Sequence, residues 1–266
     1  MLITSLQNPR IRQVLKLKTS RGRKANGLTL IDGSREVSVA LHSGAQLQEI
    51  FFCPECLDQR EGDSLLKQLI SLRIPLQEVS AKVYRKISFG EREDGLLAVC
   101  RPHRHQLDNF DFTSVSLCLV LEGIEKPGNL GAILRTCDAA GVQALLVTEV
   151  KTDIFHPNVI RASVGTVFRI PVITCGSSEA RDYLKKNRIQ IVSTVCQSEE
   201  IYTDVDFRDP TAIVLGSEEK GLSLFWKEQA DRQVKIPMQG IADSLNVSVS
   251  AALLVYEVLR QRSVSS

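Results

Sequence analysis

The feature that most constrains this chain is an apolar segment at residues 247–259, which follows a polar, glycine-containing loop at residues 236–246. Ser244, Asn246 and Ser248 stand at the junction. Asn and Ser are preferred helix N-caps because their side chains accept hydrogen bonds from the first free N–H groups. The predicted helix is apolar on nearly every face, so protein must cover it on several sides. A polar loop on a buried helix is typical of a ligand site, although an ordinary capped core helix explains the same pattern.

Two further stretches place polar residues beside apolar runs. Residues 122–136 contain Asn129 and Arg135, and residues 213–223 contain Glu218. An arginine flanked by apolar side chains is costly to bury unpaired, and its rigid fork suits phosphate or carboxylate. The alternative interpretation of Asn129 is a helix cap. The alternative interpretation of Glu218 is that it lies in the first turn of a helix near Leu222, where its negative charge interacts favourably with the helix macrodipole.

These three stretches, in this order, resemble the signature motifs of the SpoU family, the TrmH-like RNA ribose 2′-O-methyltransferases of the SPOUT superfamily. The resemblance spans residues 117–262. It implies an α/β catalytic domain with a parallel sheet and a deep trefoil knot. It also implies S-adenosylmethionine as the cofactor, no metal, and a homodimer that uses the C-terminal helix.

The resemblance also implies roles for individual residues. Arg135 would bind the phosphate beside the target nucleotide and help to activate the ribose 2′-hydroxyl, whereas Glu218 could be a general base or a structural anchor. The catalytic candidates are Asn129, Arg135, Glu218, Ser244 and Asn246. The candidates for cofactor contacts are Thr194, Gly216, Ile236 and Leu245.

Residues 1–100 predict a separate, smaller α/β domain, because short apolar strands alternate with helical patterns. The strands are expected at residues 28–31, 47–52 and 96–100, with helices after Asn8 and Ser34 and at residues 64–72. This order resembles the ribosomal-protein-like substrate-binding domain that precedes many SpoU catalytic domains, particularly those of rRNA enzymes. Residues 101–113 are polar, contain Pro102 and predict a linker to a catalytic domain at residues 114–266.

The N-terminal segment is basic, since seven basic residues and no acidic one precede Asp32. Such a segment attracts phosphate backbones, whereas a solvated face or a transit-like leader is the alternative. We therefore expect RNA contacts there and at one later arginine: Arg10, Arg12, Lys16, Lys18, Arg21, Arg23, Lys24 and Arg161.

Strands and helices also alternate in the second half of the chain, which favours a parallel sheet wrapped by helices. Strands are expected at residues 117–122, 144–148, 169–174, 190–195 and 212–215, with helices at 128–140 and 159–164. The glycine-rich turn after the first of these strands lacks the Lys-Ser/Thr ending of a P-loop, and no GxGxxG is present. A Walker ATPase and a Rossmann dinucleotide site are therefore disfavoured.

Composition narrows the class of protein further. The 266 residues are 43% hydrophobic and 24% charged, which is ordinary for a globular chain. No apolar run is long enough to span a membrane, and no secretory leader opens the sequence. The seven cysteines include a single CxxC at residues 53–56, without the second pair that a structural zinc site needs. We expect reduced thiols and a cytoplasmic protein.

The resemblance to the SpoU family implies S-adenosylmethionine-dependent 2′-O-methylation of a nucleotide in structured RNA. The N-terminal domain favours rRNA over tRNA, by analogy. One alternative is a catalytically silent RNA-binding or ribosome-assembly factor of the same fold. A role in antibiotic self-protection also remains open.

Overall fold

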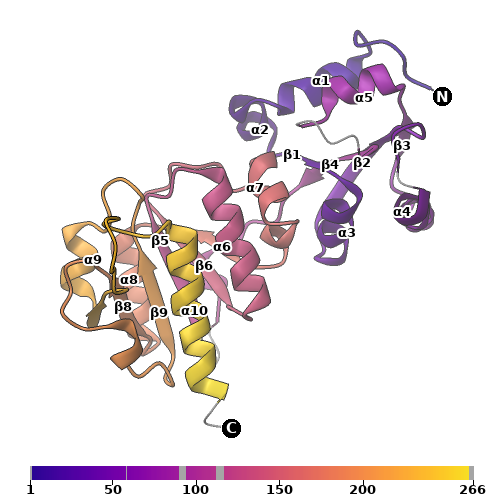
Figure 1. The fold of residues 1–266 in the computed structure, drawn as a ribbon. Helices are drawn as coiled ribbons and strands as arrows, with labels where there is room; N and C mark the ends of the chain where they lie inside the picture. The colour runs from indigo at the N-terminus through magenta and orange to yellow at the C-terminus, as the bar shows by residue number, and fades with distance from the viewer. Residues whose placement is uncertain (1, 58, 90–93, 112–116, 264–266) are drawn as a thin grey trace. The chain divides into compact units, whose positions relative to one another are not determined.

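The computed structural model describes residues 2–57, 59–89, 94–111 and 117–263, and the chain divides into two compact units (Figure 1). Unit 1 contains Met1–His103 together with Phe155–Arg169, and unit 2 contains Arg104–Ile154 with Ile170–Ser266. In the described part of the chain, no helix is both long enough and apolar enough to cross a membrane.

Unit 1 is built on a four-stranded sheet in the order β1-β4-β2-β3. Strands β1 (Thr29–Asp32) and β2 (Gln46–Phe52) run antiparallel to β4 (Leu96–Arg101), and β3 (Leu76–Glu78) runs parallel to β2. Helices α1 (Pro9–Leu17) and α5 (Ala81–Ile87) cover one face. Helices α3 (Ser34–His42) and α4 (Gln59–Ser71) cover the other face, and α2 (Ser20–Asn26) follows α1 (Figure 1). The small α/β domain expected from the sequence is therefore present.

The two helix starts expected in this unit differ in their caps. Asn8 caps α1, because its Oδ1 accepts a hydrogen bond from the backbone N–H of Arg10 at 2.9 Å, with Pro9 as the first helical residue. The prediction that Ser34 caps the next helix is wrong, because Ser34 is its first residue and Gly33 stands at the N-cap with no side chain to bond.

A segment from the second half of the sequence packs on unit 1. It contains α7 (Pro157–Ala162) and the 3₁₀ helix η2 (Thr166–Phe168), and α7 lies against β1, an edge strand of the sheet. The hydroxyl of Thr29 donates to the carbonyl of Phe155 at 2.6 Å. Gly165, at φ +83°, lies so close to α3 that an added Cβ would be 3.0 Å from the Cβ of Val39. The linear division at residue 114 did not anticipate this contact, because the contact is non-local.

Unit 2 is built on a six-stranded sheet in the order β10-β8-β9-β5-β6-β7, and every pair in it is parallel. The strands are β5 (Leu117–Glu122), β6 (Ala144–Thr148), β7 (Val172–Thr174), β8 (Gln190–Thr194), β9 (Thr211–Leu215) and β10 (Arg232–Val234). The helices are α6 (Pro127–Ala139), α8 (Ser177–Lys186), α9 (Leu224–Gln229) and α10 (Val247–Ser263), with the 3₁₀ helices η1 (Leu107–Asn109) and η3 (Tyr202–Asp204). The predicted parallel sheet is confirmed, whereas the trefoil knot stays a prediction.

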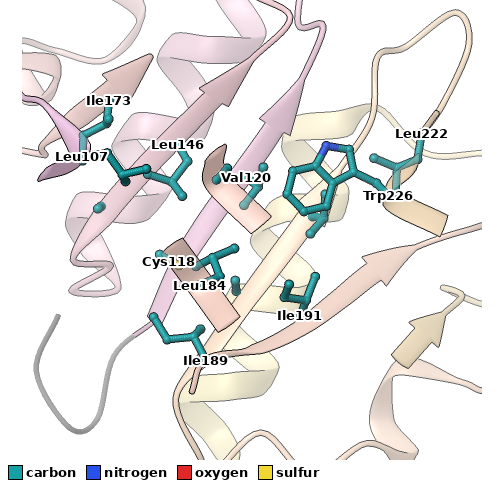
Figure 2. Close-up of a cluster of buried hydrophobic side chains, with 14 of the residues drawn as sticks. Leu107, Cys118, Val120, Leu146, Ile173, Leu184, Ile189, Ile191, Leu222 and Trp226 are labelled. Carbon is teal, nitrogen blue, oxygen red and sulfur yellow. The ribbon is translucent and has the colours of Figure 1, made fainter. Parts of the chain in front are cut away.

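The sheet of unit 2 is buried on both faces. Cys118 and Val120 of β5 point into a cluster with Leu184 of α8 and the fully buried Trp226 of α9 (Figure 2). The other face meets α6 and α10, which pack against each other. Burial on both faces explains why the strands are continuous apolar runs rather than alternating ones.

The single chain covers α10 on several sides, as the sequence predicts, but not on every side. One stripe of the helix is open, with Val249, Leu253 and Tyr256 at 46, 38 and 51% exposure. Glu257 on the same helix is buried, although it is charged. Its carboxylate accepts hydrogen bonds from Arg260 at 2.7 and 2.8 Å and from Gln261 at 2.8 Å.

Several element boundaries differ from the sequence-based expectation. The strand expected at residues 169–174 is limited to β7, and the helix expected at 159–164 ends at Ala162. The expected linker is partly structured, because Leu107 of η1 is buried in the core of unit 2. Residues 112 and 113 of that linker lie outside the described residues. The elements α2, β3, α5, α8 and β10 were not anticipated.

Candidate active site

The topology of unit 2 brings the first two motifs together. Strand β5 has β6 on one side and β9 on the other, so the chain leaves β5 in one direction and returns to its opposite side later. In such a sheet, ligands bind at the carboxyl ends of the strands where the order reverses. The first motif follows the carboxyl end of β5 and the second follows that of β9.

The Asn129 side chain joins all three motifs. Its Nδ2 donates to Oε1 of Glu218 in the second motif, and its Oδ1 accepts from Nδ2 of Asn246 in the third motif at 3.2 Å. Asn129 is the third residue of α6, whose N-cap is Lys126, so the helix-cap interpretation of Asn129 is wrong. The amide, which can donate and accept at once, suits a position between a carboxylate and a second amide.

Glu218 lies in a tight turn rather than in a helix. The turn is closed by a 2.9 Å hydrogen bond from the N–H of Gly221 to the carbonyl of Ser217, and α9 begins only at Leu224. The first-turn interpretation of this glutamate is therefore wrong. Its bond to Asn129 favours the anchor over the general base, because one carboxylate oxygen is already engaged in holding two motifs together.

The third motif enters α10 through Asn246. Its Oδ1 accepts from the N–H and the hydroxyl of Ser248 at 2.9 and 2.6 Å, which satisfies a free N–H at the helix start. Among the three polar residues expected at this junction, Asn246 is therefore the one that caps the helix.

A cavity of about 330 Å³ lies beside this junction. Its walls come from the ends of β8 and β9 and from the third motif and the start of α10, at residues 194–197, 215–222, 243–245, 247 and 250. Thr194, Gly216, Ser244 and Leu245 line it as expected from the resemblance, whereas Ile236 is half-buried and lies outside the lining. The volume falls within the range typical of small-molecule sites.

Two features of the cavity wall favour a ligand with polar groups. The Oγ1 of Thr194 is buried and has no hydrogen-bond partner among the described residues. At Gly216, an added Cβ would lie 2.1 Å from the carbonyl carbon of Gly221, so only glycine fits this close backbone approach. The cavity thus combines an unsatisfied hydroxyl at the carboxyl end of β8 with a glycine turn at the carboxyl end of the neighbouring parallel strand β9.

Sequence reasoning missed several residues around this site. Cys196, Gln197, Lys220, Lys227 and Asp243 also line the cavity. Glu122, the last residue of β5, is buried, and its two carboxylate oxygens accept from the N–H and hydroxyl of Ser223 at 2.7 Å each. Their positions directly after strands were the available signal. Among the described residues, no three metal-binding side chains lie together.

Arg135 lies on α6 outside the cavity lining. Its side chain is exposed, and no hydrogen bond or ion pair engages its guanidinium among the described residues. Six residues of helix separate it from Asn129, which corresponds to about 9 Å along the axis. The structure therefore leaves this guanidinium available to a partner from solution.

Some of the basic residues proposed to contact RNA have structural roles instead. Arg23 is buried, and its Nη1 donates to the carbonyls of Leu17 and Lys18 at 3.0 Å each, where α1 ends. Lys18 donates to the carbonyls of Lys86 and Ser88 at 3.0 and 2.7 Å, and burial lowers the pKa of its ammonium group. Both side chains satisfy helix-end carbonyls. The predicted RNA contact of Arg23 is wrong because its side chain is buried, whereas that of the half-buried Lys18 stays a prediction.

The remaining basic residues divide into paired and free side chains. Arg10 forms an ion pair with Glu49 at 2.6 Å, Arg12 donates to Gln7, and Arg161 donates to the carbonyl of Phe89 at 2.9 Å. In the described part of the chain, three exposed side chains have no such bond: Lys16, Arg21 and Lys24.

The model of the SpoU rRNA Methylase family matches residues 116–256, which include all three motifs and the cavity. The chain belongs to this family. The model of the MRM3-like substrate binding domain matches residues 8–98 of this SpoU-family chain.

Whole-chain similarities agree with this family. A crystal structure of an RNA 2′-O ribose methyltransferase is 42% identical, with a TM-score of 0.88 over 99% of this chain and 100% of the other. The SpoU methyltransferase AviRb from Streptomyces viridochromogenes, in complex with the cofactor AdoMet, is 27% identical, with a TM-score of 0.85 over 97 and 99% of the chains. The 23S rRNA (guanosine(2553)-2′-O)-methyltransferase RlmP of Bacillus subtilis is 27% identical over 96% of this chain and 98% of its own.

Replacing Gly216 tests the cavity wall. In a Gly216→Ala variant, the new Cβ would collide with the backbone of Gly221 and displace the turn that forms the wall. We expect the affinity for S-adenosylmethionine, measured by calorimetry, to fall at least about tenfold, or about 1.4 kcal/mol.

Gly128→Ala is the matched control, because a Cβ at Gly128 meets nothing within 4 Å. Equal affinities of the two variants for the cofactor would contradict the assignment of this wall.

Proposed function

We propose that this SpoU-family protein transfers a methyl group from S-adenosylmethionine to the 2′-hydroxyl of a ribose in structured RNA. The observation that carries the proposal is the junction at Asn129, where three distant motifs meet beside a cavity of about 330 Å³. Methyl transfer to an alcohol is an in-line displacement, so a site that holds its parts rigidly contributes much of the catalysis.

The residues of the cavity fit the cofactor. The unpartnered hydroxyl of Thr194 can bond a polar group of the adenosine, and backbone groups of Gly216 and Leu245, which line the cavity, can contact it. When bound, S-adenosylmethionine supplies an electrophilic methyl group on a sulfonium. The chain's own task is to orient this ligand and to exclude water from it.

Arg135 is proposed as the catalytic residue. Its free guanidinium can bind the phosphate beside the target nucleotide and stabilise the 2′-oxygen as its proton leaves. Asn129, Glu218 and Asn246 are positioning residues in this account, because they bond to one another. Ser244 lines the cavity and completes the polar wall.

Ribosomal RNA is the substrate class that we favour. The matching family model is described as an rRNA methylase family, RlmP acts on 23S rRNA by its name, and unit 1 matches a substrate-binding domain. The free side chains of Lys16, Arg21 and Lys24 can hold an RNA backbone.

We place the reaction in the cytoplasm, where cysteines such as the seven free ones of this chain stay reduced.

Removing the guanidinium of Arg135 tests the catalytic assignment. In an Arg135→Ala variant, we expect methyl transfer to rRNA to fall more than about 100-fold, or roughly 2.7 kcal/mol of transition-state stabilisation. The affinity for S-adenosylmethionine should stay the same, because Arg135 does not line the cavity. Initial rates with a radiolabelled methyl donor and calorimetry of the cofactor measure the two effects.

Arg188→Ala is the control for loss of an exposed arginine. Arg188 precedes β8, at the sheet edge opposite to the carboxyl ends of the strands. Full activity of the Arg135→Ala variant would contradict the catalytic role of Arg135. If the wild type methylates tRNA alone, the substrate is tRNA rather than rRNA.

We also propose that the protein is a homodimer in which α10 takes part. Val249, Leu253 and Tyr256 recur at spacings of four and three and form one apolar stripe that the single chain leaves open. A helix face of this kind is stabilised when a second apolar surface covers it.

Leu253→Asp tests this assembly. Because Leu253 is already 38% exposed in the single chain, the aspartate should leave each chain folded while it opposes apolar packing between two copies. We expect wild-type dimers and variant monomers in sedimentation at micromolar concentration. Ile70→Asp, at an exposed apolar residue of α4, is the control and should remain dimeric. A monomeric wild type would refute the homodimer.

A further inference from the structure

Unit 1 contains a second cavity, of about 530 Å³, that the catalytic account does not use. It opens beside α1, and its floor is apolar, with Val14 and Leu17 from α1 and Val99 from β4. All three floor residues belong to the buried core of the unit. A volume of this size is typical of sites that bury a small molecule or one unit of a polymer.

Polar groups surround this apolar floor. Gln13 and Gln48 line the cavity, and neither side-chain amide has a hydrogen-bond partner among the described residues. Each amide can donate and accept at once, as the edge of a nucleobase requires. The cavity therefore combines apolar lining side chains with unused, two-way hydrogen-bonding groups.

A bulge in β2 brings polar side chains into this cavity. The register of β2 against β4 shifts between Leu47 and Glu49, so Gln48 is an extra residue in the strand. In a regular strand successive side chains point to opposite faces, yet Gln48 and Glu49 both line the cavity. Bulges redirect side chains in this way and are frequent beside functional sites.

The charges at the rim suit a phosphate next to the bound group. Lys16, in the last turn of α1, lines the cavity with an exposed ammonium and has no ion-pair partner in the described part of the chain. Arg10 is held by Glu49 at 2.6 Å, but this ion pair is partly exposed, so it contributes little and can exchange for a phosphate.

From these contacts we infer that the cavity beside α1 binds one unstacked nucleotide of the RNA substrate. The base lies on the floor of Val14, Leu17 and Val99, its edge bonds to the amides of Gln13 and Gln48, and its phosphate meets Lys16. This inference rests on the proposed function, because it assigns a recognition site for the same RNA. Under this inference, unit 1 recognises an exposed base of the RNA in addition to binding the backbone phosphates through basic side chains.

Nuclear magnetic resonance of the full-length, ¹⁵N-labelled protein tests the site directly. The four nucleoside 5′-monophosphates and, separately, ribose 5-phosphate are the probes. We expect at least one nucleotide to shift the side-chain amide signals of Gln13 and Gln48 with a Kd on the order of 1 mM. Ribose 5-phosphate should leave them in place. Unmoved signals with all four nucleotides, or equal shifts with ribose 5-phosphate, would overturn the base site.

Enzyme kinetics supply the second arm. Gln48→Leu should raise the KM for RNA about tenfold, or about 1.4 kcal/mol, and leave kcat and cofactor affinity unchanged. Gln46→Leu is the matched control, because Gln46 is an exposed glutamine of the same strand outside the cavity. An unchanged KM in Gln48→Leu would contradict the inference.

The two proposals fail separately. If the wild type transfers methyl groups but no nucleotide shifts the amide signals of Gln13 and Gln48, the proposed function is retained and only the nucleotide site is rejected. Nucleotide shifts at Gln13 and Gln48 without any methyl transfer would retain the site and reject the enzyme.

Discussion

The hydrogen bonds of the Asn129 side chain connect three segments that lie far apart in the chain. Its amide nitrogen holds Glu218 in the turn after β9, and its oxygen holds Asn246 at the start of α10. The segments of Glu218 and Asn246 also contribute residues to the wall of a cavity. Because a partly buried amide left without partners is costly, the bonds favour one arrangement of the loops over others. The candidate active site depends on this arrangement.

The parallel sheet of unit 2 makes this junction possible. Strands β5 and β9 are neighbours with their carboxyl ends together, so motifs separated by about ninety residues reach one edge. Their burial on both faces keeps those ends fixed, and Glu122 adds a direct link through its two bonds to Ser223. The polar site is thus held by a rigid apolar framework, as catalysis by positioning requires.

The parts of the structure that could be predicted are those with local signals. Apolar runs predicted most strands of unit 2, and the family resemblance implied cofactor contacts for Thr194, Gly216 and Leu245, which all line the cavity. The failures have two causes. Arg23 resembles a surface cation in the sequence, but the end of α1 and the short helix α2, which the sequence did not predict, place it on the carbonyls of Leu17 and Lys18. The other failures are non-local. No periodicity indicates that residues 155–169 pack on unit 1 or that Gln48 occupies a bulge.

Mass spectrometry of nucleosides from treated RNA tests the central claim most directly. Purified protein, S-adenosylmethionine and unmodified rRNA or tRNA are incubated, and the RNA is then digested and analysed for methylated nucleosides. The account predicts one ribose 2′-O-methylated nucleoside in rRNA, formed only when the cofactor is present. Methylation on a base, or no methylation of either RNA, would contradict it.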